Sequence, residues 1–110
     1  MRPVGWIGRS REEIREFPED ARRHAGQELS RVQRGLEPFD WKPIRSIGPG
    51  VSEIRVRDSS GEYRVVYVAK YAEAIYVLHC FHKTTQKAEQ HTIELARRRF
   101  RQLIQERVHG

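Results

Sequence analysis

The chain has 110 residues, and its 21 Lys and Arg against 15 Asp and Glu give a net charge of +6 at neutral pH. This length fits a single domain, 1–110, and no apolar run approaches the roughly 20 residues that cross a bilayer. The single cysteine, Cys80, excludes an internal disulfide and a site of four cysteines. It suits a reducing compartment, so we expect a cytoplasmic protein that binds no membrane.

The first third of the sequence predicts a short edge strand followed by a helix hairpin. The strand spans 3–7, and Ser10 and Glu13 have the spacing of a capping box at the start of a helix. Pro18 then begins a second helix, which Gly35 ends. The second helix has one apolar face, made of Ala21, Ala25, Leu29 and Val32.

The remainder predicts a loop, a sheet and a closing helix. Residues 36–50 are rich in Pro and Gly, and three strand-like runs follow at 51–57, 62–70 and 75–82. Short connections make these strands antiparallel neighbours. From about residue 91 an amphipathic helix presents Ile93, Ala96, Phe100, Leu103 and Val108 on one side. We therefore predict an α+β fold: N-terminal helix hairpin, antiparallel sheet of three or four strands, and C-terminal helix.

Strand parity predicts a cluster of charged side chains on one face of this sheet. A two- or four-residue loop at 58–61 places Arg64 on the same face as Glu53, Arg55 and Arg57. The same rule at 71–74 adds Val77, His79, Phe81 and Lys83. The opposite face becomes the core, with Ile54, Val56, Tyr63, Val65, Tyr67, Tyr76, Leu78 and Cys80. Arginines placed opposite each other are either neutralised by carboxylates or hold an anion, and the pattern leaves both readings open.

The sequence resembles the RelE/HigB-like toxin family, and within it the phage-derived Gp49-like branch. The likeness rests on VSEIRVR at 51–57, GEYRVVY at 61–67, YVLHCFHKTTQK at 76–87 and FPED at 17–20. It implies a microbial-RNase-like fold and the toxin half of a toxin–antitoxin pair. Such toxins cut mRNA in the ribosomal A site without metal or other cofactor, because the RNA 2′-OH attacks the adjacent phosphate. The partners implied are ribosome-bound mRNA, ribosomal RNA and a helix-turn-helix antitoxin, which can form a higher-order complex with the toxin.

The resemblance also implies roles for individual residues. Arg64, Lys83, His79 and Glu53 are the expected catalytic residues. We expect Arg55, Arg57 and Arg64 to hold the phosphate, His79 or Glu53 to take the 2′ proton, and Lys83 to assist the leaving group. The expected RNA contacts are Arg55, Arg57, Phe81, His82 and Lys87. Thr84 stands where relatives carry a second lysine, and the chain lacks their C-terminal tyrosine, so the acid–base pair stays open.

Three other interpretations of the sequence remain beside that of a ribosome-dependent nuclease. A ParE-like toxin shares the fold but binds DNA gyrase without catalysis, and a phage accessory protein would bind RNA or protein without toxicity. His79 and Lys83 beside three arginines favour the nuclease. A metal site at His79 and His82 is disfavoured, because these side chains point to opposite faces of one strand.

Overall fold

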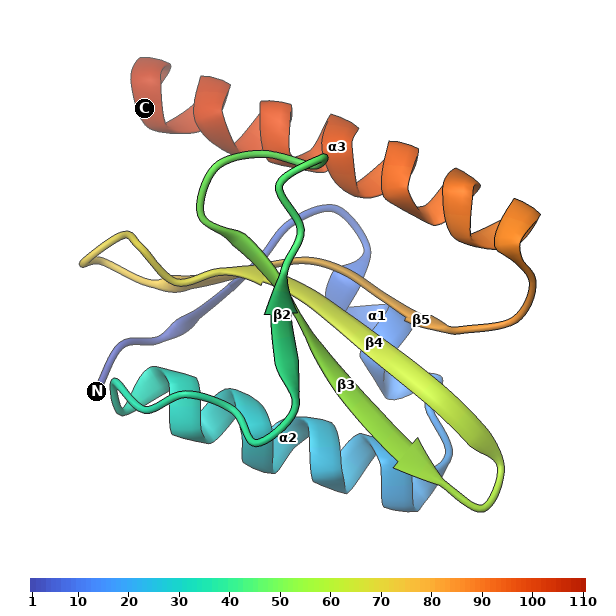
Figure 1. The fold of residues 1–110 in the computed structure, drawn as a ribbon. Helices are drawn as coiled ribbons and strands as arrows, with labels where there is room; N and C mark the ends of the chain where they lie inside the picture. The colour runs from blue at the N-terminus through green and yellow to red at the C-terminus, as the bar shows by residue number, and fades with distance from the viewer.

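The fold is a five-stranded sheet with helices on both faces. The computed structural model describes the backbone of all 110 residues and every side chain except that of Gln86. In chain order the elements are β1 (Val4–Trp6), α1 (Ser10–Arg15), α2 (Glu19–Gln33), β2 (Trp41–Pro43), β3 (Val51–Asp58), β4 (Gly61–Val68), β5 (Ile75–His82) and α3 (Gln86–His109). The strand order is β1-β5-β4-β3-β2, and the sheet lies between α2 on one side and α3 on the other (Figure 1).

The predicted α+β class is confirmed, but the sheet has five strands where three or four antiparallel ones were expected. β1 runs parallel to β5 at one edge, as the pairing of Val4 with Ile75 shows. At the other edge β2 pairs antiparallel with β3, inside the segment predicted to be a loop. Pro43 is compatible with β2 because an edge strand leaves one row of donors unpaired.

The second helix has the boundaries and the buried face that the sequence predicts. Its four small and branched apolar residues, Ala21, Ala25, Leu29 and Val32, are all buried. The helix ends at Gly35, whose φ of 83° is easy for glycine. The Gly35 N–H donates to Val32 O at 3.0 Å and the Leu36 N–H to Arg31 O at 2.9 Å, which is a Schellman ending.

The first helix does not begin with the predicted capping box. Ser10 lies inside the first turn with a buried hydroxyl, and none of the described side chains caps the helix. The Glu13 carboxylate turns instead toward β5 and α3. The two helices pack mainly on the sheet, α1 against β5 and α2 against β3, rather than on each other as a hairpin would.

The register between the two central strands is confirmed. Ser59 and Ser60 form a two-residue turn, so Arg55 lies directly opposite Arg64. Between β4 and β5 the parity prediction holds only in part, because a bulge interrupts the ladder near Leu78. His79 and Phe81 lie on the Arg64 face as expected. Val77 is on the opposite, α2-facing side, while Tyr76 and Leu78 lie on the α3 side, contrary to the prediction.

A second apolar core lies between the sheet and the C-terminal helix. Ala96, Phe100 and Leu103 are buried there against residues such as Val66. α3 starts earlier than predicted, and the Thr85 hydroxyl caps it by accepting from the Ala88 N–H at 3.2 Å. Val108 was expected on the apolar face but is 73% exposed, because the helix extends past the sheet. None of the described helices has the length and apolar character to cross a membrane.

Two glycine substitutions test the packing of this second core. A Cβ added to Gly48 would overlap the buried ring of Phe100, whereas a Cβ on Gly26 in α2 meets none of the described atoms within 4 Å. We expect Gly48→Ala to lower the free energy of unfolding by about 1–3 kcal/mol through overpacking. Gly26→Ala should raise it by about 0.5–1 kcal/mol, because alanine favours the helix. Urea denaturation of both variants measures the difference, and equal effects would contradict this packing.

Candidate nucleic-acid interface

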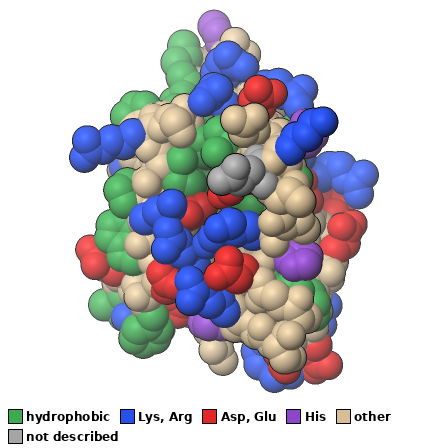
Figure 2. All heavy atoms as spheres, turned by 45° about the vertical axis from the view of Figure 1, so that its right-hand side comes forward, with side chains coloured by type: hydrophobic (Ala, Val, Ile, Leu, Met, Phe, Trp, Pro, Cys, Tyr) green, Lys and Arg blue, Asp and Glu red, His purple; other side chains and the backbone are tan. Residues whose placement is uncertain are grey.

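Five cationic side chains from neighbouring strands gather on the α3-facing side of the sheet. This group, called the cation cluster below, comprises Lys42, Arg55, Arg57, Arg64 and Lys83. Two carboxylates, Glu53 and Glu62, lie among them. Figure 2 shows Lys and Arg side chains interspersed with Asp and Glu on one face of the molecule.

The two carboxylates neutralise the cation cluster only in part. Glu53 Oε1 lies 3.6 Å from Lys42 Nζ and 3.5 Å from Arg55 Nε. Glu62 Oε1 lies 2.8 Å from Arg57 Nε, and its Oε2 is 3.6 Å from Arg64 Nη2 and 4.0 Å from Lys83 Nζ. Five positive against two negative groups leave a surplus of positive charge, which attracts an anion.

Arg64 lies at the centre of this face with donors that the other described side chains leave unused. The residue is 4% exposed, and among the described residues nothing accepts a hydrogen bond from its buried Nε or Nη1. A buried donor without a partner costs about 1–3 kcal/mol. Guanidinium N–H groups match phosphate oxygens in geometry and charge. The arrangement is therefore suited to holding a phosphate that would complete the hydrogen bonding of Arg64.

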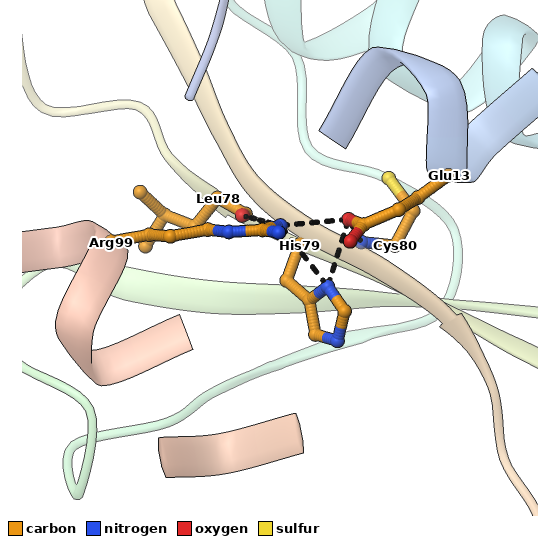
Figure 3. Close-up of polar contacts among 5 residues, drawn as sticks. All are labelled: Glu13, Leu78, His79, Cys80 and Arg99. Atoms are coloured by element: carbon orange, nitrogen blue, oxygen red, sulfur yellow. Dashed lines mark hydrogen bonds and ion pairs between the residues drawn. The ribbon is translucent and has the colours of Figure 1, made fainter. Parts of the chain in front are cut away.

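His79 belongs to a buried network with Glu13 of α1 and Arg99 of α3. Glu13 Oε1 lies 2.8 Å from His79 Nδ1 and 2.8 Å from Arg99 Nη1, and it accepts from the Cys80 N–H at 3.2 Å (Figure 3). Arg99 Nη1 also donates to Leu78 O at 3.0 Å, beside the bulge in β5. The network thus joins two helices to one strand through a single carboxylate oxygen.

The electrostatics of this network favour the charged form of Glu13. Burial alone would raise the pKa of the carboxyl group, but hydrogen bonds from His79 and Arg99, the charge of His79 and the Cys80 N–H act in the opposite direction. The net effect lowers the pKa of Glu13 from 4.5 to about 2. The sequence did not predict this role, because it placed Glu13 in a helix cap and Arg99 on a solvated helix side.

His79 was expected to accept a proton from RNA, and the structure places it in an enclosed position where that role stays a prediction. The residue is 5% exposed, its Nδ1 faces Glu13, and its Nε2 is also buried. Like Arg64 Nε and Nη1, this Nε2 has no hydrogen-bond partner among the described residues. Its ring stacks on Phe81 with centroids 5.1 Å apart, so His79 positions the Phe81 ring.

The structure brings most other expected site residues together. Four of them, Arg55, Arg57, Arg64 and Lys83, belong to the cation cluster, and Glu53 lies among these cations. The three further residues expected to contact RNA do not all share this face. Phe81 is partly exposed on the same face, Lys87 is exposed in the first turn of α3, and His82 stacks on Tyr63 on the other face.

Sequence reasoning missed Lys42 and a specific role for Glu62. Lys42 lies in β2, which was expected to be a loop, so no face could be assigned to it. Glu62 pairs with Arg57 across the β3–β4 ladder, and the confirmed register was sufficient to find it. Lys42 adds a positive charge to this face, and Glu62 offsets part of the positive charge of the cation cluster.

Comparisons with known proteins agree with this architecture. A family model described as "Phage derived protein Gp49-like (DUF891)" matches residues 12–101. Among solved structures, a mutant of the E. coli toxin RelE in the free state is similar, with a TM-score of 0.61 and 18% sequence identity. The alignment covers 84% of this chain and 95% of that one, so the two share a fold. A search of curated proteins found no match.

Proposed function

The chain belongs to the phage-derived Gp49-like family and has a RelE-like fold, and on this premise we propose that it is the toxin of a toxin–antitoxin pair that cuts mRNA on the ribosome. The observation that carries this proposal is Arg64, buried within a cation cluster that retains positive charge, with two nitrogens left unpaired by the described residues. Phosphate is the ligand that such a group recognises best.

The proposed reaction is a transfer within the RNA. The 2′-oxygen loses its proton, bonds to the adjacent phosphorus and displaces the 5′-oxygen, which takes up a proton. The products are a 2′,3′-cyclic phosphate and a 5′-hydroxyl. Arg64 and Arg55 stabilise the charge that develops on the phosphate oxygens. Because His79 Nδ1 already faces Glu13, we assign the 2′ proton to Glu62, the more exposed of the two carboxylates among the cations, and the proton for the leaving oxygen to Lys83.

The exposed side of α3 is the proposed contact with ribosomal RNA. Arg98 and Arg101 are exposed there, away from the apolar side of the helix. Contacts with the ribosome would help to align the message with the cation cluster. The proposed protein partner is a helix-turn-helix antitoxin, in a complex of one or more copies of each protein.

Charge reversal on α3 tests the ribosome contact. We expect Arg98→Glu combined with Arg101→Glu to reduce cleavage of ribosome-bound mRNA about tenfold or more, because each lost phosphate contact weakens binding. The matched control is Arg22→Glu with Arg23→Glu on exposed positions of α2, across the sheet. The control should cut normally. Equal activity of the two double variants would contradict an RNA contact on α3.

Induced expression in bacteria tests the function itself. The proposal predicts that translation stops within minutes and that mapped 5′ ends reveal cuts inside translated messages. A DNA damage response without mRNA cuts would indicate gyrase binding instead, and normal growth of cells that contain folded protein would indicate a non-toxic binding protein. Either of these last two outcomes contradicts the nuclease.

A further inference from the structure

A small pocket adjoins the cation cluster where the beginning of α3 crosses the sheet. An open cavity of about 60 Å³ lies between the sheet, the β2–β3 connection and α3. Five of the nine residues that line it are apolar: Ile44, Ile47, Val66, Phe81 and Ile93. Lys42 of the cation cluster and the neighbouring Glu53 also line it, as do Glu89 and Thr92 of α3. The pocket and the cluster therefore form one continuous surface.

We propose that this pocket receives one edge of a purine base of the RNA, while the phosphate of that nucleotide lies on the cation cluster. The inference rests on the proposed function and adds to it a determinant of substrate choice. The occupant is a base because the apolar walls suit a flat aromatic group, while Lys42 and Glu53 supply polar partners at one edge. A base beside a bound phosphate is the arrangement that a nucleotide offers.

Phe81 supplies an aromatic surface held in a fixed position. Its ring stacks on His79, with centroids 5.1 Å apart and planes inclined by 24°. Glu13 and Arg99 in turn hold His79. Contact between a base and an aromatic side chain contributes about 1–3 kcal/mol to binding. A purine covers more of such a surface than a pyrimidine does, so burial of apolar area favours purines here.

The polar edge of the pocket favours guanine among the bases. Lys42 Nζ lies 3.6 Å from Glu53 Oε1, which places a donor beside an acceptor. The Watson–Crick edge of guanine presents a carbonyl oxygen beside two N–H donors, and it complements this pair. A carboxylate only accepts hydrogen bonds when ionised. Uracil presents one N–H between two carbonyl oxygens, so one of them would face the carboxylate of Glu53.

Titration of the purified full chain with nucleotides tests the pocket. With ¹³C-labelled isoleucine methyl groups, we expect 3′-GMP to shift the signals of Ile44, Ile47 and Ile93. Ile104, which packs farther along α3, should not respond. Binding of 3′-GMP should be about tenfold tighter than that of 3′-UMP, as for a site that pairs with the edge of one base. Equal affinities would overturn the proposal.

A pair of matched substitutions separates the pocket from the cation cluster. Ile93→Trp fills the pocket, whereas Ile104→Trp makes the same change on the same helix outside it. We expect only Ile93→Trp to remove the preference for 3′-GMP. Inorganic phosphate should still shift the Arg64 side-chain signal in both variants. A preference for 3′-GMP that survives in Ile93→Trp would overturn the pocket while leaving the proposed function standing.

One further outcome of these titrations would contradict the proposed function and leave the pocket standing. If 3′-GMP shifts the isoleucine methyl groups while neither nucleotide nor phosphate affects Arg64, the pocket binds a base but the cation cluster does not hold phosphate. That result supports a base site and contradicts the assignment of Arg64 to RNA. The two proposals thus fail through different signals.

Discussion

Glu13→Gln is expected to lower the free energy of unfolding by about 3–5 kcal/mol, because it removes the counter-charge of a buried arginine. Arg99 Nη1 and His79 Nδ1 both lie 2.8 Å from Glu13 Oε1. The amide of glutamine keeps the shape of the side chain but supplies no negative charge. Urea denaturation at neutral pH measures the loss. The matched control is Glu12→Gln, on the exposed side of the same helix, and it should change stability little.

The same carboxylate makes stability depend on pH in the acid range. Folding lowers the pKa of Glu13 from 4.5 to about 2. Its contribution is therefore complete above pH 4.5 and is lost as the pH falls toward 2, where the carboxylate is protonated in both states. This amounts to about 3 kcal/mol. In Glu13→Gln the free energy of unfolding should change less with pH between 4.5 and 2 than in the wild-type chain. An unchanged pH dependence in this variant would show that another group is responsible.

Arg64→Met is expected to reduce cleavage of ribosome-bound mRNA by about 10²–10³-fold, the usual cost of removing a donor that stabilises developing charge. The same substitution should raise the free energy of unfolding by about 1–3 kcal/mol, since it removes buried donors without partners. Single-turnover cleavage and urea denaturation measure the two effects. A residue with only a structural role would lose activity and stability together.

Two further variants complete this test. Arg64→Lys keeps the charge but loses the paired N–H groups, so it should recover only part of the activity. Arg34→Met, at the exposed end of α2, controls for the general effect of replacing arginine by methionine. Full activity in Arg64→Met would remove Arg64 from the proposed mechanism.

Local rules predicted the parts of the site that depend on a single turn. The Ser59–Ser60 turn fixes the register of β3 and β4, and the register places Arg55 opposite Arg64. The same counting failed in β5, because the bulge near Leu78 reverses the faces of the residues before it. The bulge depends on the packing of neighbouring elements, because Arg99 of α3 donates to the Leu78 carbonyl there. No local sequence pattern predicted it.

Such local rules could not predict contacts between residues that lie far apart in the sequence. Glu13 and Arg99 are 86 positions apart, and each also satisfied a simpler local pattern. Glu13 had the spacing of a helix cap, and Arg99 continued a basic run. Their pairing requires α1 and α3 to meet at β5, which depends on the complete fold.

The most direct test of the account is cleavage of one defined mRNA on purified ribosomes, with a matched message carrying a 2′-deoxynucleotide before the mapped cut. The account predicts that the wild-type chain cuts the all-ribose message and leaves a 2′,3′-cyclic phosphate, while the deoxy message stays intact at that bond. Cleavage of both messages, or of neither by folded protein, would contradict it.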